Sequence, residues 1–288
     1  MASPTYRDLI RRGTKRLNDA GIEEAAREAR LLLALAADCQ TVDLIAREYD
    51  RLSDAAILTR FDVFLERRAS REPFAHIAGY KNFFGLTLKS DARALVPRSD
   101  SEIAVERALD LLPRGRSVTV ADLGTGSGCL LAAILNKRGG VRGIALEAHA
   151  DTAALARENF KRLALMDRVE LVIGSWTDWQ HWAMADLVIS NPPYIRSSEI
   201  AGLDPEVRDY DPRVALDGGE DGLTAYREII SLARKHMPEA APLVLEIGFD
   251  QAESVSSLLN SSDFTDISIL KDFSGHDRVV SARSPSAK

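Results

Sequence analysis

The spacing of apolar positions predicts that the first part of the chain is helical. Up to about residue 75, apolar side chains recur every three or four positions, as on one face of an α-helix. Glycines, prolines and β-branched runs are scarce, and Gly21 separates the first two segments as a helix C-terminal stop would. We therefore expect a small helical bundle over residues 1–75. The pattern includes Leu9, Ile10, Leu17, Ala25, Ala29, Leu32, Leu33, Leu44, Ile57, Phe61 and Leu65.

Residues 76–96 have a different pattern, which predicts a connector built from extended segments. Short runs of aromatic and β-branched residues are interrupted there by Gly79 and Gly85. Such runs around a glycine turn favour a β-hairpin.

From residue 97 to the end, residue 288, near-continuous apolar runs alternate with helical patterns. This alternation predicts an α/β fold: a Rossmann-like sheet of seven mostly parallel strands with helices on both faces. The predicted strands cover residues 117–123, 143–146, 169–173, 185–190 and 242–247, with two further β-rich runs at 267–270 and 278–283.

Composition narrows the possible classes of protein. The chain has 288 residues, 45% apolar and 28% charged, as expected for a globular protein with a second, smaller domain. It lacks the run of about 18 apolar residues that a membrane helix needs. Charged residues recur through the first thirty positions, so we expect no secretory leader there. Cys39 and Cys129 are far apart, so we expect no disulfide framework and a cytoplasmic location.

Charge and histidine spacing bear on partners and metals. The formal net charge is −6, which disfavours stable nonspecific binding to nucleic acid phosphates. The five histidines lack metal-ligand spacing, so no metal site is expected.

The first candidate site is the glycine-rich turn Asp122-Leu-Gly-Thr-Gly-Ser-Gly128, which lies between a predicted strand and a predicted helix. Ligands of such folds bind at the carboxyl ends of the strands. The glycines are spaced G-x-G-x-G rather than as a dinucleotide fingerprint, and this suits a nucleoside joined to an amino acid, such as S-adenosylmethionine. Gly124, Thr125, Gly126, Ser127 and Gly128 are the predicted cofactor loop.

Two residues after later strands complete the predicted cofactor site. Glu147 follows the second strand, about 20 residues past the glycine turn, where an acid can accept hydrogen bonds from both ribose hydroxyls. Trp176 follows the third strand and could stack on the adenine ring, although a core position would explain this side chain nearly as well.

The second candidate site is Asn191-Pro-Pro-Tyr194, directly after the fourth strand. The prolines fix the backbone and remove two N–H donors. The carboxamide of Asn191 and the carbonyl of Pro192 can then accept hydrogen bonds from a substrate NH2 group, and Tyr194 can form a flat wall beside it. Asn191, Pro192 and Tyr194 are the predicted catalytic residues, and Pro193 completes the predicted substrate site.

Together these motifs resemble methyltransferases that modify exocyclic or amide nitrogens, a class that includes DNA adenine methyltransferases. Other segments resemble the HemK/PrmC family of release factor glutamine methyltransferases, and the resemblance covers almost the whole chain. These segments are Pro73–Gly79, Leu95–Glu102, Glu206–Gly222, Leu245–Gly248 and Lys271–Val280.

The resemblance implies a class I S-adenosylmethionine-dependent methyltransferase that yields S-adenosylhomocysteine. It implies methylation of the glutamine in the Gly-Gly-Gln motif of peptide chain release factors, and thus a role in translation termination. It also places cofactor contacts at residues 124–128, Glu147, Trp176 and Asn191, and the amide site at Asn191–Tyr194. The N-terminal bundle would help to dock the release factor.

Three positions depart from the family pattern. Glu147 and Ser175 stand where aspartate is usual, and Ser99 stands where a second proline is usual. The change at Ser99 moves the chain toward the glutamine methyltransferases of ribosomal proteins. Methylation of a ribosomal protein therefore stays open as an alternative, with DNA adenine methylation and a non-catalytic binding module as weaker ones.

Overall fold

The computed structural model describes residues 3–113 and 115–285, and its contacts divide the chain into two compact units. The smaller unit comprises the residues up to Gly79 together with Asp204–Tyr210. The larger unit comprises Tyr80–Leu203 and the residues from Asp211 onward. Within the described residues, no helix is both long and apolar enough to cross a membrane.

The smaller unit is a helical bundle with its own core. Leu17, Leu32, Leu33 and Phe61 are fully buried in it. Its first helix begins with a capping box, because the Thr5 hydroxyl accepts from the Asp8 amide at 3.1 Å and the Asp8 carboxylate accepts from the Thr5 amide at 3.0 Å. The helices are α1 (Tyr6–Asp19), α2 (Ala25–Ala37), α3 (Thr41–Ala46), α4 (Ala55–Ala69), α5 (Phe74–Ala78) and α9 (Pro205–Arg208).

Helix α9 comes from a distant part of the sequence and is held in the smaller unit by charge pairing. Glu206 forms ion pairs with Arg68 at 3.0 Å and with Arg71 at 2.6 Å. Arg68 is buried and also pairs with Glu28 on α2. The Tyr210 hydroxyl donates to the carbonyl of Ser70 at 2.7 Å. Because Arg68 is buried, removal of one of its carboxylate partners would leave its charge poorly compensated and would strongly destabilise the fold. Loss of an exposed ion pair would have a much smaller effect.

The larger unit contains a seven-stranded sheet in the order β5-β4-β3-β6-β7-β9-β8. The pairs from β5 to β7 are parallel, while β9 runs antiparallel to both β7 and β8. The predicted fold of seven mostly parallel strands is therefore confirmed. The strands are β3 (Val118–Leu123), β4 (Val141–Glu147), β5 (Val169–Ile173), β6 (Leu187–Ser190), β7 (Pro242–Glu246), β8 (Thr265–Lys271) and β9 (Asp277–Arg283).

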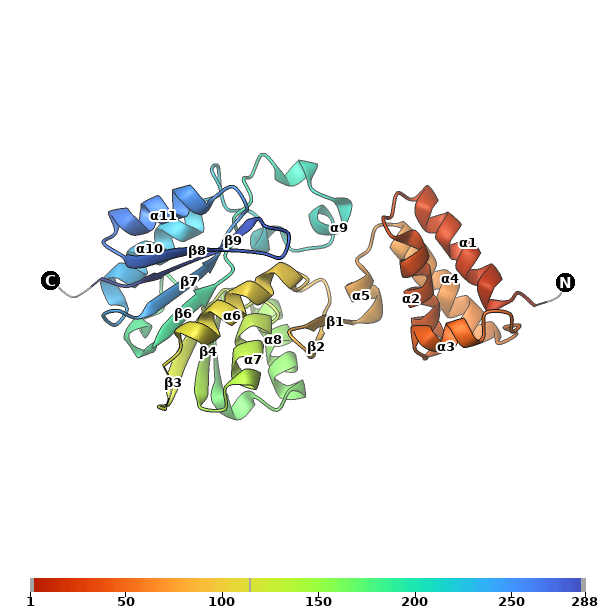
Figure 1. Cartoon of the computed structure of the whole chain (residues 1–288), viewed down its shortest axis with the longest axis horizontal. Helices are drawn as coiled ribbons and strands as arrows, with labels where there is room; N and C mark the ends of the chain where they lie inside the picture. Colours follow the sequence, from red (N-terminus) through yellow and green to blue (C-terminus); the bar gives the residue numbers. More distant parts are fainter. Residues whose placement is uncertain (1–2, 114, 286–288) are drawn as a thin grey trace. The chain divides into compact units, whose positions relative to one another are not determined.

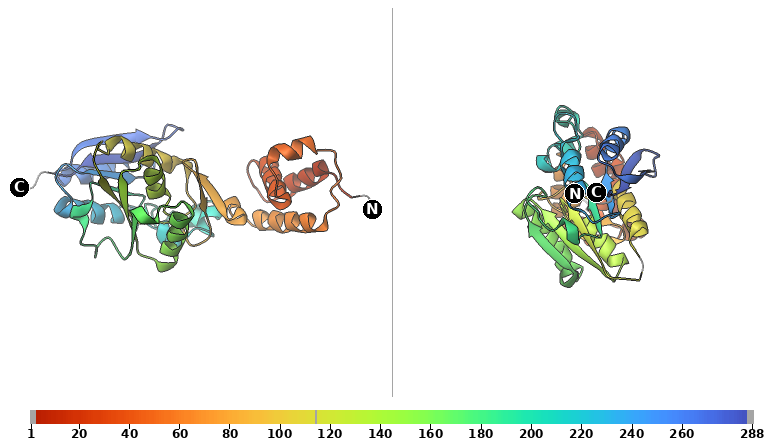
Figure 2. Two further views of the ribbon diagram at one scale, coloured as in Figure 1. Left: turned by 90° about the horizontal axis from the view of Figure 1, so that it is seen from below. Right: turned by 90° about the vertical axis from the view of Figure 1, so that its left-hand side faces the viewer.

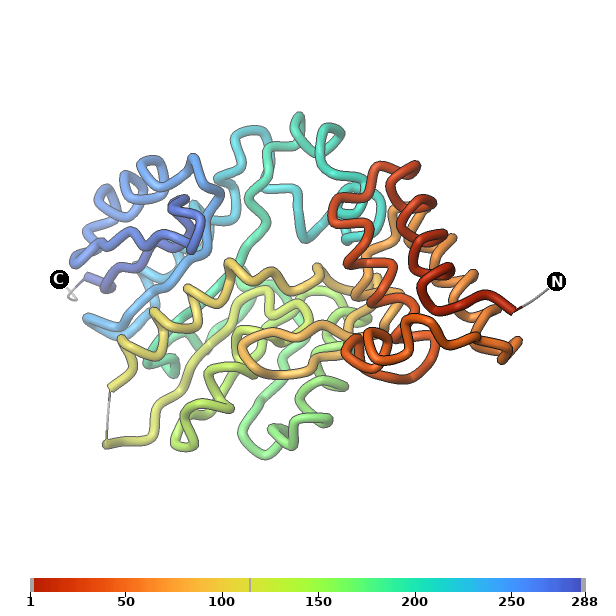
Figure 3. The backbone as a smooth tube through the Cα atoms, turned by 45° about the vertical axis from the view of Figure 1, so that its right-hand side comes forward, coloured from red at the N-terminus to blue at the C-terminus, as the bar shows by residue number. Residues whose placement is uncertain are grey.

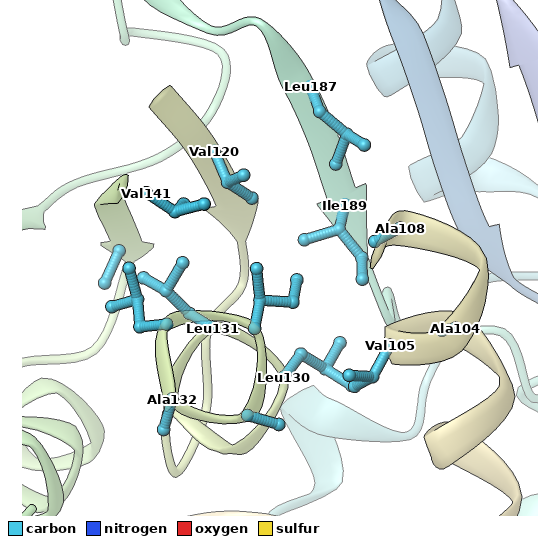
Figure 4. Packing of buried hydrophobic residues seen from close by; sticks show 14 of the residues in the cluster. Ala104, Val105, Ala108, Val120, Leu130, Leu131, Ala132, Val141, Leu187 and Ile189 are labelled. Carbon is cyan, nitrogen blue, oxygen red and sulfur yellow. The ribbon is translucent and has the colours of Figure 1, made fainter. Parts of the chain in front are cut away.

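Helices cover both faces of this sheet (Figure 1, Figure 2). One core cluster joins the sheet to α6 (Glu102–Leu111), α7 (Cys129–Lys137) and α8 (Ala150–Arg162). The other joins it to α10 (Thr224–His236) and α11 (Ala252–Ser261). Figure 4 shows side chains of α6 and α7 converging on Val120 of β3 and Ile189 of β6. Burial on both faces explains why the inner strands β3, β4, β6 and β7 are largely apolar.

A short antiparallel hairpin precedes the sheet. It pairs β1 (Tyr80–Phe83) with β2 (Leu86–Lys89). Phe83 and Leu88 are buried in the same core cluster as α6 and α7, so the hairpin is packed into the larger unit.

The strand order reverses between β3 and β6. From β3 the chain continues outward to β4 and β5, whereas β6 lies on the other side of β3 and leads to β7. Ligands of doubly wound sheets bind beyond the carboxyl ends of the strands at such a switch point. The glycine-rich turn follows β3 and the Asn191–Tyr194 segment follows β6, so the topology brings both to this position. Figure 3 shows the long segment after β6 as a green-to-cyan trace.

Candidate active site

A cavity of about 150 Å³ lies at the switch point and is lined by both predicted loops. The glycine-rich turn contributes Gly124, Thr125, Gly126 and Ser127, and the segment after β6 contributes Asn191 and Pro193. The predicted cofactor and substrate loops therefore share one cavity. The remaining lining residues are Arg93, Ala94, Leu95, Pro97, Arg98, Ser101, Cys129, Leu130, Glu147, Ala148, His149, Thr152, Trp176, Pro212, Val214 and Ala215.

Backbone hydrogen bonds fix the start of the glycine-rich turn to the neighbouring strand. The amides of Gly124 and Thr125 both donate to the carbonyl of Leu146, at 2.9 Å each. The Thr125 hydroxyl donates to the Asp122 carboxylate at 2.6 Å. Asp122 is fully buried, and this burial raises its pKa to about 7 against the opposing effect of the Thr125 hydrogen bond. These contacts hold the turn before any ligand is bound.

Gly128 ends the turn without lining the cavity. It caps α7 with a φ of 83°, and a Cβ at this position would lie 2.8 Å from Cζ of Phe160. Only glycine fits both the backbone angle and the contact.

Glu147 lies at the end of β4, lines the cavity and is 7% exposed. One carboxylate oxygen accepts from the amide of Gly126 and the other from the amide of His149, both at 3.0 Å. A carboxylate offers about four acceptor positions, so Glu147 can bind two further hydroxyls while it continues to support the turn.

Trp176 lines the cavity beside the glycine-rich turn. Its Cζ3 would lie 3.5 Å from a Cβ built on Gly124, and its indole N–H donates to Glu228 at 2.9 Å. The ring also packs against the core cluster under α10 and α11. Trp176 is therefore a cavity wall and a partly buried core residue at once.

The structure separates the four residues of the segment after β6. Asn191 and Pro193 line the cavity, whereas Pro192 is buried and neither Pro192 nor Tyr194 is among the lining residues. Tyr194 packs against the core beneath, where burial raises the pKa of its phenol to about 12. The predicted role of Tyr194 as a wall for the substrate stays a prediction.

Leu216, Gly218 and Gln251 hold the backbone at the end of the Asn191–Tyr194 segment, and we call these three residues the clamp. The amide of Ile195 donates to the carbonyl of Leu216 at 2.9 Å, and the amide of Gly218 donates to the carbonyl of Ile195 at 2.8 Å. A Cβ on Gly218 would lie 2.7 Å from Cα of Tyr194, so any larger residue would displace the loop. The Gln251 side chain adds a hydrogen bond to the carbonyl of Tyr194 at 3.0 Å.

Two polar residues beside the site were not predicted as functional. Gln251 is one, and Glu246, at the end of β7, is the other. Glu246 is 2% exposed, and burial raises its pKa to about 7, although hydrogen bonding from Ser101 and then the charge of Arg278 act in the opposite direction. An acidic residue directly after an apolar run, within Leu245–Gly248, is the sequence signal that could have pointed to it.

A reactive thiol and a metal site find little support among the residues that the structure describes. Cys129 lines the cavity, but burial raises the pKa of its thiol to about 12, so it is neutral near pH 7. Residues 3–113 and 115–285 contain no group of three or more His, Cys, Asp or Glu placed to hold a metal ion.

The arrangement therefore combines an acid, an aromatic wall and a preformed backbone turn with a neighbouring carboxamide.

A family model of the PrmC N-terminal domain matches residues 8–79, and one of the methyltransferase small domain matches residues 102–202. The release factor glutamine methyltransferase of Caulobacter vibrioides is 41% identical over 265 residues, 92% of this chain and 91% of the relative. That of Cereibacter sphaeroides is 39% identical over 280 residues, 97% of this chain and 99% of the relative.

This chain belongs to the release factor glutamine methyltransferase family. The resemblance drawn from the sequence motifs is thereby confirmed. Among solved structures, the hMettl16 catalytic domain in complex with a MAT2A 3′UTR hairpin superposes with a TM-score of 0.58 at 17% identity. It covers 71% of this chain and 77% of that one, and it shows that the two share a fold.

Proposed function

We propose that this protein transfers a methyl group from S-adenosylmethionine to the side-chain amide nitrogen of the glutamine in the Gly-Gly-Gln motif of a peptide chain release factor. The single observation that carries the proposal is the cavity shared by the glycine-rich turn and Asn191. The kinship with release factor glutamine methyltransferases over nearly the full chain supports the choice of substrate. A release factor substrate would place the activity in the cytoplasm.

The residues of the cavity fit S-adenosylmethionine. Glu147 has unused acceptor positions for a ribose diol, and the flat face of Trp176 suits adenine. The glycine-rich turn allows the backbone to approach a ligand without interference from Cβ atoms. When bound, S-adenosylmethionine supplies a strongly electrophilic methyl group on its sulfonium.

The role of the protein is to make an unreactive nitrogen available. The lone pair of an amide nitrogen is delocalised into its carbonyl, as in the peptide bond, so the nitrogen is a weak nucleophile. The Asn191 carboxamide oxygen and the Pro192 carbonyl would each accept one hydrogen of the substrate NH2 group. Acceptors that are fixed in advance favour the positive charge that develops on the nitrogen.

Orientation of the two reacting groups supplies much of the remaining reduction in the activation free energy. Holding two reacting groups in line can be worth roughly 7–11 kcal/mol. Here the clamp formed by Leu216, Gly218 and Gln251 holds the Asn191–Tyr194 backbone, and the contacts of Asp122 and Glu147 hold the glycine-rich turn.

The test is methylation of defined substrates by the purified protein. Release factor isolated from cells lacking the methyl group is incubated with labelled S-adenosylmethionine, and the Gly-Gly-Gln peptide is analysed by mass spectrometry. We expect one methyl group on the glutamine and none when that glutamine is replaced by alanine. Labelling of a ribosomal protein or of adenine in duplex DNA, with an unlabelled release factor, would overturn the proposed substrate.

The N-terminal unit is proposed to dock the release factor. Val42 and Ile45 of α3 and the nearby Tyr49 are 61%, 69% and 70% exposed, which is unusual for large apolar side chains and supports a binding role. Ile45→Asp should raise the KM for the release factor severalfold and leave the Kd for S-adenosylmethionine unchanged. An unchanged KM would remove α3 from the docking surface.

A further inference from the structure

Glu246 and Asn191 are neighbours at the ends of adjacent parallel strands. The register of β6 and β7 pairs Ser190 with Leu245, so the next residues along the two strands are Asn191 and Glu246. Asn191 lines the cavity, whereas Glu246 lies behind it and is 2% exposed. Hydrogen bonding from the Asn191 side chain is among the influences that lower the pKa of the Glu246 carboxyl group, against the larger effect of burial.

Burial of a carboxyl group among apolar strands is unfavourable unless the group is hydrogen-bonded or paired with a charge. Its Oε2 atom has no hydrogen-bond partner among the residues that the structure describes. Leaving such an atom unpaired is unfavourable, because it has lost its hydrogen bonds to water and gained none in exchange. The two groups whose hydrogen bonds favour its ionised form, Ser101 and Asn191, both line the cavity.

We propose that Glu246 is a positioning residue for the methyl transfer, holding the Asn191 carboxamide so that its oxygen faces the substrate amide. An ionised carboxylate can only accept hydrogen bonds, so it selects the NH2 side of Asn191. The Asn191 oxygen is then left pointing away from Glu246, toward the cavity. This inference rests on the proposed function, in which that oxygen accepts a hydrogen from the substrate amide.

Protonation of Glu246 would remove this selection. A protonated carboxyl group can donate to the Asn191 oxygen and withdraw it from the substrate. Because burial raises the pKa of Glu246 to about 7, the active, ionised form is lost as the pH falls through about 7. The charged and titratable groups that influence this region are Arg278 on β9, Asp100 beside α6, Cys129 on α7, Tyr194 after β6 and Tyr226 on α10.

The experiment compares four forms of the full chain: wild type, Glu246→Gln, Asn191→Ala and the double variant. The turnover number for methylation of the release factor is measured from pH 5.5 to 8.5 at saturating S-adenosylmethionine. Saturation matters because Asp122, whose pKa is also raised to about 7, lies under the cofactor loop and would act through cofactor affinity.

We expect kcat of Glu246→Gln to fall about tenfold, a typical coupling between contacting residues, and its dependence on pH near 7 to flatten. In the Asn191→Ala background the same change should have no further effect, because Glu246 acts through Asn191. A purely structural role would lower kcat by the same factor in both backgrounds and preserve the pH profile, which would overturn the inference.

Two further outcomes are distinguishable. If Glu246→Gln does not fold, the pH profile of Asn191→Ala decides alone: the loss near pH 7 should be absent from it, and its persistence would contradict the inference. If the wild type does not methylate the release factor at all, the proposed function itself fails, independently of Glu246.

Discussion

The side chain of Asn159 on α8 donates a hydrogen bond to the backbone carbonyl of Ser127 in the glycine-rich turn, at 2.9 Å. The same carboxamide accepts from the amide of Lys89 at 2.7 Å and donates to the carbonyl of Lys89 at 3.1 Å. Asn159 is fully buried. One side chain therefore joins the end of the β1–β2 hairpin to the cofactor loop.

Asn159→Leu should destabilise the protein and weaken cofactor binding. It keeps a side chain of similar size but removes the partner of one buried group, the Ser127 carbonyl, and of two part-buried groups, the Lys89 amide and carbonyl. An unpaired buried group costs about 1–3 kcal/mol, and a part-buried group costs less because water can reach it. We expect the free energy of unfolding in urea to fall by about 2–4 kcal/mol, with a weaker Kd for S-adenosylmethionine by calorimetry. Asn136→Leu, at an exposed position on α7, is the matched control. Equal stability of the two variants would contradict the linking role.

Asn191→Ala should lower kcat by about 100-fold or more, the scale seen when one fixed polar contact to a transition state is removed. The Kd for S-adenosylmethionine should remain largely intact, because the turn and Glu147 are untouched. Rates come from methyl incorporation into the release factor, and affinity comes from calorimetry. Asn260→Ala on the exposed side of α11 controls for the loss of an asparagine. A wild-type rate for Asn191→Ala would reject its role at the amide.

Glu147→Gln should act on cofactor affinity rather than on turnover. The amide replaces one acceptor oxygen by a donor, so the side chain can no longer accept from Gly126, His149 and two hydroxyls together. We expect the Kd for S-adenosylmethionine to rise about tenfold, since hydrogen bonds to a charged group are worth roughly 1.5–3 kcal/mol. At saturating cofactor, kcat should stay near the wild-type value. Glu170→Gln, exposed on β5, is the control, and an unchanged Kd in Glu147→Gln would exclude this acceptor role.

Gly218→Ala should lower kcat, although Gly218 is not among the residues that line the cavity. The added methyl group would lie 2.7 Å from Cα of Tyr194 and 2.9 Å from the carbonyl oxygen of Pro193, so the Asn191–Tyr194 backbone must move. A displacement of reacting groups by about 1 Å can cost about 100-fold in rate. Gly202→Ala is the matched control, because a Cβ there meets nothing within 4 Å. Similar kcat values for the two alanine variants would show that the clamp does not position the loop.

The sheet was predictable because its inner strands β3, β4, β6 and β7 are buried on both faces and are therefore largely apolar. The predicted strands at 169–173 and 185–190 contain or match β5 and β6, and the alternation with helices indicated the parallel order. The meeting of the glycine-rich turn with Asn191 also followed, since both follow strands that end at the same edge of the sheet.

What was missed depends on the register between strands and on packing between distant segments. Glu246 matters because β7 lies beside β6, and Asn159 matters because α8 covers the turn after β3; neither neighbour is visible from local spacing. The membership of Asp204–Tyr210 in the N-terminal unit was also missed. It depends on the pairing of Glu206 with Arg68 and Arg71, and single charged residues carry no such signal in a sequence.

The membership of α9 in the helical bundle has a consequence for engineering. The bundle is encoded in two separate stretches, so it is not a cassette that can be exchanged by cutting at Gly79 alone. A chimera that imports the first stretch from a relative without the second would set a foreign arginine pair against the native Glu206. Specificity for a new protein substrate should therefore be transplanted with both stretches together, as a matched set.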